Sequence, residues 1–100
     1  MKNFRTFDLA VTFYRTSRSL PLRGSIKEQL GRAAQSIPLN LAEGRGRSTS
    51  KDQIKFFNIA MGSLRECQAI LIIEQLETSE AWQDLDRLGA ALYKLIKNAQ

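Results

Sequence analysis

Four cationic side chains lie close together in the middle of the chain, in a setting suited to binding phosphate. The stretch 44–50 reads GRGRSTS and supplies Arg45 and Arg47, and Lys51 and Lys55 follow it four residues apart. Glycine allows a backbone to approach a ligand closely, and the free amides at the start of a helix attract anions. Together with Arg32 on the preceding segment, these residues predict a basic rim that grips phosphates without reading the base sequence.

The charge distribution extends this candidate interface. Residues 1–50 contain nine Lys and Arg against three carboxylates, whereas residues 51–100 contain six against seven, and the net charge is +5. We expect the basic groups of the first half to converge on one continuous surface that binds a polyanion. The alternative is a solvated surface that only keeps the protein soluble. The candidate nucleic-acid-binding residues are Arg18, Arg23, Arg32, Arg45, Arg47, Lys51 and Lys55.

The residue types that the chain lacks argue against an enzyme. There is no histidine and only one cysteine, Cys67, so His-based triads, His–metal sites and the usual tetrahedral zinc sets are excluded. A Ser–Lys pair or a pair of carboxylates remains conceivable, but no spacing favours one. We therefore expect no catalytic residue, no cofactor and no metal ion.

Length and composition predict a single domain over residues 1–100. Hydrophobic residues make up 43% and charged residues 25%, as in ordinary globular domains. Cys67 has no partner for an intrachain disulfide, which fits a reducing cytoplasm, and we expect it to be a buried, inert thiol. The longest apolar run has five residues, 69–73, against about 18 for a membrane span. We therefore expect a cytoplasmic protein without membrane contact.

Helical periodicity marks four segments, and no segment alternates like a strand. They cover about 4–18, 25–43, 50 to between 75 and 77, and 79–99. In the first segment the predicted buried stripe is Phe4, Phe7, Val11 and Tyr14. Four helices joined by short connections predict an all-α, antiparallel up-down-up-down four-helix bundle.

Polar residues with capping preferences predict where these helices begin and end. Ser25 and Ser50 each precede a Glu or Gln by three residues, which is the capping-box pattern of an N-cap. Thr78 or Ser79 is the predicted N-cap of the last helix. Gly44 is the predicted C-cap of the second helix.

Several residues within the second segment have structural interpretations. Pro38 predicts a kink, and Ser36 or Asn40 could satisfy the backbone groups that it frees. Arg32 and Glu43 could form a capping or interhelical ion pair near one end of the bundle. These interpretations compete with functional roles for the same residues.

The third segment carries more apolar side chains than one small bundle needs. Glycines inside the helices, at Gly31, Gly62 and Gly89, predict close backbone approach between helices or subunits. The surplus apolar residues predict a subunit interface, although a wide core face is the alternative. They are Phe56, Ile59, Ile72 and Ile73.

The block 30–47 and the helix that follows it form a recognisable pattern. They resemble the signature of the four-helix bundle family associated with 23S rRNA intervening sequences, a family similar to the accessory proteins of diversity-generating retroelements. The connection around 77–80 is shorter here than in many relatives. The matching residues are Arg32, Ala33, Ala34, Ser36, Ile37, Asn40, Leu41, Ala42, Glu43, Gly44, Arg47, Lys51, Phe56, Phe57, Ile59, Ala60, Gly62, Ser63, Leu64 and Glu66.

The resemblance implies a bacterial four-helix bundle that assembles into a ring, usually a pentamer, and associates with nucleic acid or a reverse transcriptase. Together with the basic residues, it favours an oligomeric accessory protein that binds RNA or DNA independently of sequence. The alternative is a ring-shaped scaffold that docks an acidic protein or a nucleic-acid enzyme such as a reverse transcriptase. In that case the partner would be a polypeptide, and free nucleic acid would bind only non-specifically.

Overall fold

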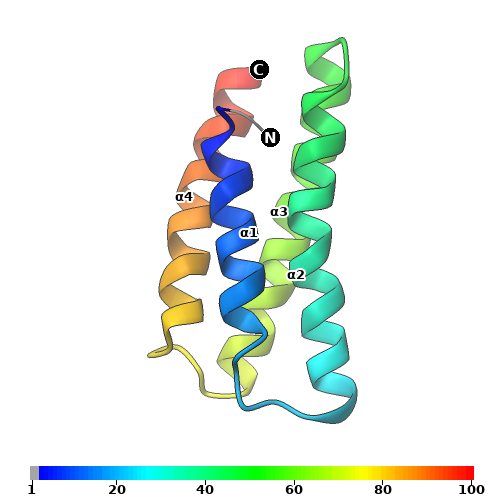
Figure 1. The fold of residues 1–100 in the computed structure, drawn as a ribbon. Coiled ribbons are helices and arrows are strands. Elements are labelled where there is room, and N and C mark those ends of the chain that lie inside the picture. Colours follow the sequence, from blue (N-terminus) through cyan, green and yellow to red (C-terminus); the bar gives the residue numbers. More distant parts are fainter. Residues whose placement is uncertain (1–2) are drawn as a thin grey trace.

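Four α-helices follow one another in the computed structural model, which describes residues 3–100. They are α1 (Arg5–Ser17), α2 (Gly24–Arg45), α3 (Ser50–Ile73) and α4 (Glu80–Ala99). Consecutive helices run in opposite directions, and the start of α1 and the end of α4 lie at the end that carries the α2–α3 turn (Figure 1). The predicted all-α, up-down-up-down bundle is confirmed. It measures 40 × 22 × 22 Å.

The core runs along the axis of the bundle. Each helix packs against its neighbours in sequence, and α1 closes the bundle against α4. Phe13, Ile37, Leu64, Leu88 and Leu92 are among the largest fully buried side chains, so all four helices contribute. Burying one such side chain stabilises the fold by about 1.5–3 kcal/mol.

Helix α1 buries a different face from the predicted stripe. Of that stripe only Phe4, just before the helix, is buried, and the helix itself buries Thr6, Ala10, Phe13 and Ser17. Large apolar residues dominate a hydropathy pattern, whereas small and hydroxyl residues add little to it. Burial of Ser17 is inexpensive because its hydroxyl donates to the carbonyl of Tyr14 at 2.7 Å.

The N-caps of α3 and α4 are both provided by hydroxyl side chains. Ser79 is confirmed as the cap of α4, since its Oγ accepts from the amide of Trp82 at 3.2 Å. The cap predicted at Ser50 is wrong by one residue. Thr49 takes this role, and its Oγ1 accepts from the amide of Asp52 at 3.2 Å.

Both predicted ends of α2 are also displaced. The helix begins at Gly24, whose φ is +67°, so Ser25 already lies in its first turn, and no side chain caps this end. At the other end the helix continues past Gly44 to Arg45, and Gly46 is the C-cap. The glycine at position 44 serves packing, as described below.

Helix α2 continues without interruption through Pro38. The Nδ2 of Asn40 donates to the carbonyl of Ser36 at 2.9 Å and to its hydroxyl at 3.0 Å. Asn40 thus bonds the helix backbone, but the carbonyl that it reaches is that of Ser36 and not the carbonyl of Ala34 that Pro38 leaves without its helix donor.

Helix α3 ends at Ile73, earlier than predicted. Gln75 has a φ of +58°, and the amide of Leu76 donates to the carbonyl of Leu71 at 2.8 Å. This is the pattern of a Schellman-type helix end, at which the left-handed residue is usually glycine. A glutamine in that place gives no stop signal in the sequence.

The helix glycines differ in what surrounds them. A Cβ added at Gly31 or Gly62 would meet no atom within 4 Å, and one at Gly89 would make an ordinary contact with Leu64 at 3.8 Å. Close approach between helices is therefore not found at positions 31 and 62, and the alternative of an approach between subunits stays a prediction. Helices do approach closely at Gly44, where a Cβ would lie 2.7 Å from Cε1 of Phe57.

Helix α3 is long and apolar enough, by length and composition, to cross a membrane. In the bundle it packs against α2 and α4 and contributes to the core. Much of its surplus apolar surface is exposed, as predicted, although Phe56 is half-buried. The exposed large apolar residues of the described chain are Leu39, Ile59, Ile72, Ile73 and Tyr93.

Candidate nucleic-acid interface

The turn between α2 and α3 is short and tied to both helices. The amide of Arg47 donates to the carbonyl of Gly44 at 3.1 Å, which continues the end of α2. The Nε2 of Gln53, in the first turns of α3, donates to the carbonyl of Arg47 at 3.1 Å. Backbone held from both sides therefore positions the basic side chains of the turn.

The guanidinium of Arg47 has two partners. Its Nη2 lies 2.8 Å from Oε2 of Glu43, and its Cζ lies 4.6 Å from the centroid of the Phe56 ring. The Nζ of Lys55 lies 5.7 Å from the same centroid. The predicted ion pair of Glu43 with Arg32 is wrong, because Glu43 pairs with Arg47 one helical turn later. About 43% of the Arg47 side chain remains exposed.

Arg45 faces the N-terminal segment. Its Cζ lies 4.4 Å from the centroid of the Phe4 ring, and its Nη1 donates to the carbonyl of Asn3 at 3.4 Å. Since Phe4 is buried, this contact fastens the start of α1 to the end of α2. Arg45 thus has a structural role at the same place as its predicted functional one.

Lys51 and Lys55 lie on exposed positions of the first turns of α3. No ion pair to either lysine occurs within residues 3–100. The start of α3 adds the partial positive charge of a helix N-terminus, although Thr49 occupies one of its amides. This combination is favourable for an anion on electrostatic grounds.

The structure brings four of the seven predicted binding residues together and separates the other three. Arg45, Arg47, Lys51 and Lys55 surround the α2–α3 turn. Arg18 and Arg23 flank the α1–α2 connection at the opposite end of the 40 Å bundle, and Arg32 lies about two turns into α2. The seven therefore form two groups rather than one continuous surface.

Arg18 and Arg32 do share a groove between α1 and α2. This groove has a volume of about 690 Å³, and Lys27 and Glu28 also line it. Arg18 donates from Nη1 to the hydroxyl of Tyr14 at 2.7 Å. The carboxylate of Glu28 thus lies among the three cations of this groove, Arg18, Lys27 and Arg32.

Charge in the folded chain segregates by the end of the bundle rather than by half of the sequence. The half that carries the α2–α3 turn, here termed the turn end, comprises residues 3–10, 35–61 and 91–100. The other half contains seven cationic side chains and seven carboxylates; Lys2 lies outside the described residues. At the turn end seven cationic side chains face three carboxylates: Arg5, Arg45, Arg47, Lys51, Lys55, Lys94 and Lys97 against Asp8, Glu43 and Asp52.

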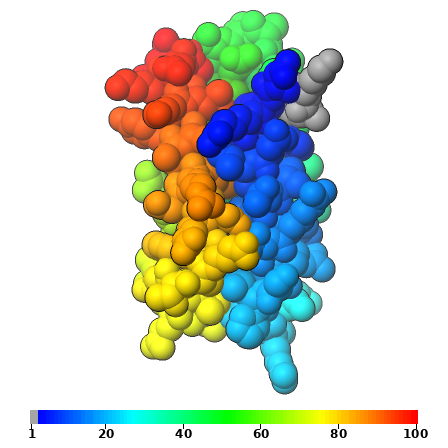
Figure 2. Space-filling model, turned by 60° about the vertical axis from the view of Figure 1, so that its left-hand side comes forward, coloured from blue at the N-terminus to red at the C-terminus, as the bar shows by residue number. Residues whose placement is uncertain are grey.

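Three of these cations were missed by the sequence analysis. Arg5 begins α1, while Lys94 and Lys97 lie in the last turns of α4. The start of α1, the end of α4 and the α2–α3 turn meet at one end of the molecule (Figure 2). The alternating helix directions of the predicted bundle already imply that these three segments meet, so the predicted topology could have identified Arg5, Lys94 and Lys97.

Several residues of the block 30–47 and of the helix that follows it serve the packing of α2 on α3. The hydroxyls of Ser36 and Ser63 lie 2.8 Å apart, and Nε2 of Gln29 donates to Glu66 at 3.2 Å. Together with the contact at Gly44, these bonds join the two helices along their length. Most of the block is therefore accounted for by structure.

The single thiol of the chain, Cys67, lies in the core. Cys67 is fully buried, and burial, with a smaller contribution from Glu66, raises its pKa to about 12. The predicted buried thiol is thus confirmed. Within residues 3–100 no group of three or more His, Cys, Asp or Glu side chains could hold a metal ion.

Comparison with models of protein families gives a match that covers most of the chain. The model described as 23S rRNA-intervening sequence protein matches residues 4–77. The chain belongs to this family. The family match covers α1, α2, α3 and the connection that follows them, while α4 lies beyond it and completes the bundle. The comparison with curated proteins gives no match.

Proposed function

We propose that this member of the 23S rRNA-intervening sequence protein family is an accessory protein that binds nucleic acid through its turn end, independently of base sequence. The observation that supports this function best is the excess of cations over carboxylates at that end. Contacts between Lys or Arg and phosphates supply most sequence-independent affinity. The family description names an rRNA, which makes RNA the first ligand to test.

The contacts of Arg45 and Arg47 support the same proposal. Each guanidinium rests on an aromatic ring, at 4.4 Å and 4.6 Å from the ring centroids. A side chain that is already ordered loses less conformational entropy when it binds. Arg47 can exchange Glu43 for a phosphate, because an exposed ion pair is worth only about 0–1 kcal/mol.

The binding experiment measures the affinity of a structured RNA and of a duplex DNA as a function of salt concentration. Changing Arg47→Ala and Lys51→Ala together removes two phosphate contacts, so the log–log salt slope should become shallower by about 1.4–1.8. The double variant Arg15→Ala/Arg65→Ala removes the same charge from exposed positions of the other half and should leave the slope close to wild type. Undetectable or salt-insensitive binding of the wild type would rule out the proposal.

We also propose that the chain forms a homo-oligomer, with the pentamer of the resemblance as the expected size. Ile59, Ile72 and Ile73 of α3 are 44%, 51% and 70% exposed. Covering them with a second copy of the chain would remove this apolar surface from water. Native mass measurement should give a multiple of 11.3 kDa that persists after nuclease treatment. Ile59→Glu/Ile73→Glu should lower that mass; a wild-type monomer would contradict self-association.

A protein-binding scaffold is the second candidate function. Leu39 is 61% exposed and shares a shallow depression with Ala42, Glu43 and Arg47. Apolar and charged groups side by side are typical of protein interfaces. In this case an acidic protein or a nucleic-acid enzyme should copurify at fixed stoichiometry after nuclease treatment, and Leu39→Glu should release it.

A further inference from the structure

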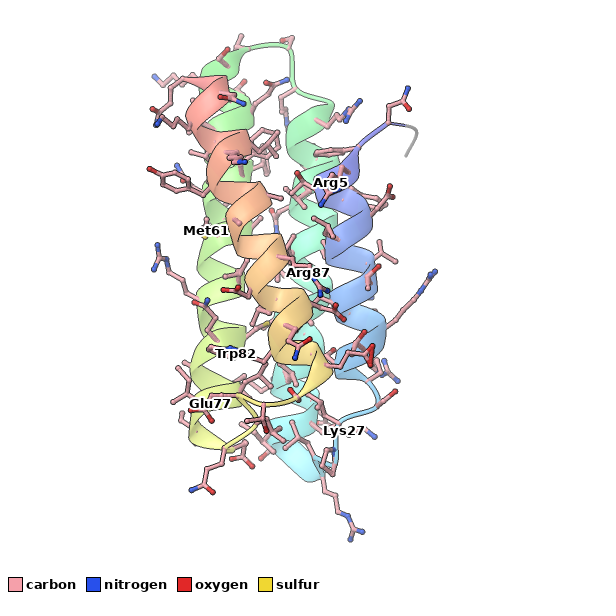
Figure 3. All side chains as sticks on the ribbon, turned by 90° about the vertical axis from the view of Figure 1, so that its left-hand side faces the viewer. Arg5, Lys27, Met61, Glu77, Trp82 and Arg87 are labelled. Atoms are coloured by element: carbon pink, nitrogen blue, oxygen red, sulfur yellow. The ribbon has the colours of Figure 1, made fainter. Side chains whose placement is uncertain are left out.

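A second basic groove lies on the opposite side of the bundle from the α2–α3 pair. It runs between α1 and α4, has a volume of about 580 Å³ and contains three cations, Arg5, Arg87 and Lys94. Figure 3 faces this side, with Arg5 on α1 and Arg87 on α4. No carboxylate of the described chain lines the groove.

One cation of the groove, Arg87, is paired with a carboxylate of its own helix that also accepts a hydrogen bond from α1. Arg87 donates from Nη1 to Oδ1 of Asp84 at 3.1 Å, and the hydroxyl of Thr16 donates to Oδ2 of the same carboxylate at 2.8 Å. The Asp84 side chain is only 9% exposed, whereas that of Arg87 is 61% exposed. The carboxylate is thus almost buried, while the guanidinium that pairs with it is largely exposed to solvent.

The spacing of the cations fits a chain of phosphates. Arg87 and Lys94 are seven residues apart on one helix, a rise of about 10 Å. Because neighbouring phosphates of a strand are separated by a flexible sugar, one strand can present phosphates to both cations over this span. Ala90 and Ala91 lie between the two cations and leave the groove open, since their side chains are small.

We infer that the α1–α4 groove holds the phosphate backbone of a single nucleic-acid strand. This inference rests on the proposed function and deepens it, because it extends the contact from the turn end along one side of the bundle. Arg5 and Lys94 belong both to the turn end and to this groove, so the two surfaces are continuous. A positively charged groove that follows the backbone is one of the two features by which proteins hold single strands, the other being aromatic rings on which bases stack.

The test compares the salt dependence with which a single-stranded RNA oligonucleotide binds to four proteins. These are the wild type, the groove variant Arg87→Ala/Lys94→Ala, the turn variant Arg47→Ala/Lys51→Ala and the control Arg15→Ala/Arg65→Ala. The groove variant should flatten the log–log slope by about 1.4, which is two single-strand phosphates. If the variants melt at the same temperature as the wild type, a change in slope reports lost charge rather than lost packing. Arg87→Lys keeps the charge and alters the packing, so its slope provides a second check.

The outcomes distinguish the inference from the function on which it rests. A shallower slope in the groove variant, beyond that of the control, supports the groove. A slope equal to the control, while the turn variant still flattens it, overturns the groove and leaves the proposed function intact. No binding by any protein overturns both. If polyglutamate requires the groove cations while RNA does not, the groove takes an acidic polypeptide and the inference is wrong.

Discussion

Gly44 shows how one residue fixes the approach of two helices. Its backbone lies against the ring of Phe57, which is only 3% exposed, and against Cβ of Phe56. The absence of a side chain at position 44 lets the aromatic rings of α3 reach the backbone of α2. The same two rings belong to the region that carries Arg47 and Lys55, so this packing also positions the basic side chains.

Replacing this glycine should destabilise the protein. In an exposed helix interior, Gly→Ala stabilises by about 1 kcal/mol, but a Cβ at position 44 would lie 2.7 Å from Cε1 of Phe57. Overpacking of this kind costs about 1–3 kcal/mol, so Gly44→Ala should lower the free energy of unfolding in urea.

The matched control is Gly62→Ala, where the new Cβ meets nothing within 4 Å. This variant should be stabilised by about 0.5–1 kcal/mol. If both alanine variants gain stability, the close contact at Gly44 does not exist in solution.

Cys67 makes stability depend on pH in the alkaline range. In the folded protein, burial is the main cause that raises the pKa of the Cys67 thiol to about 12 from an ordinary value of 9.0. Above pH 9 the unfolded chain therefore loses a proton that the folded chain keeps. The free energy of unfolding should fall as pH rises from 9 towards 12 and should be insensitive to this group below pH 9.

Urea unfolding of the wild type and Cys67→Ala between pH 8 and 11 measures this effect. The variant should be less stable at pH 8, since it lacks a buried side chain, but its stability should decline less steeply with pH. Parallel pH curves would show that the thiol ionises equally easily in both states.

The positions of the helix ends were harder to predict from the sequence than the helices themselves. Periodicity gave all four helices, because spacing of apolar residues reports which face is buried. The ends depend on single backbone angles and on which hydroxyl reaches an amide. Thr49 and Ser50 are both good caps, and the sequence alone could not rank them.

The end of α3 offers a test of this conformational point. Gln75 has a φ of +58°, and the left-handed conformation costs an L-residue about 1–2 kcal/mol. Gln75→Gly should therefore raise the free energy of unfolding by up to about 1 kcal/mol, after the greater entropy that glycine brings to the unfolded chain is allowed for.

Gln83→Gly, within α4, provides the contrast. Glycine in a regular helix should cost about 1 kcal/mol. If both glycine variants are destabilised alike, residue 75 does not adopt the left-handed conformation in solution.

The distribution of charge is a property of the whole molecule. When the sequence is divided at residue 50, the excess of cations lies in the first half. A bundle, however, brings together residues from opposite ends of the chain. Arg5 and Lys94 lie in one groove although 89 positions separate them in the sequence. The predicted topology was enough to show that these residues lie at the turn end. The contacts of Arg45 and Glu43, in contrast, could be known only from the positions of their side chains.

The separation of Arg18 and Arg23 from the turn has the same origin. Helix α2 has 22 residues, so its two ends are about 30 Å apart at 1.5 Å per residue. Residues that follow one another closely in the first half of the sequence are thus carried to opposite ends of the bundle. A count of charge per half of the sequence contains no information on this distance.

The central claim is that nucleic acid contacts the turn end. Cross-linking of a photoreactive RNA to the native protein, followed by mass spectrometry of the attached peptides, tests it most directly. We predict that the cross-links concentrate in residues 45–56, with further sites near Arg5 and Lys94. Cross-links confined to residues 15–32, at the opposite end of the bundle, would contradict the account.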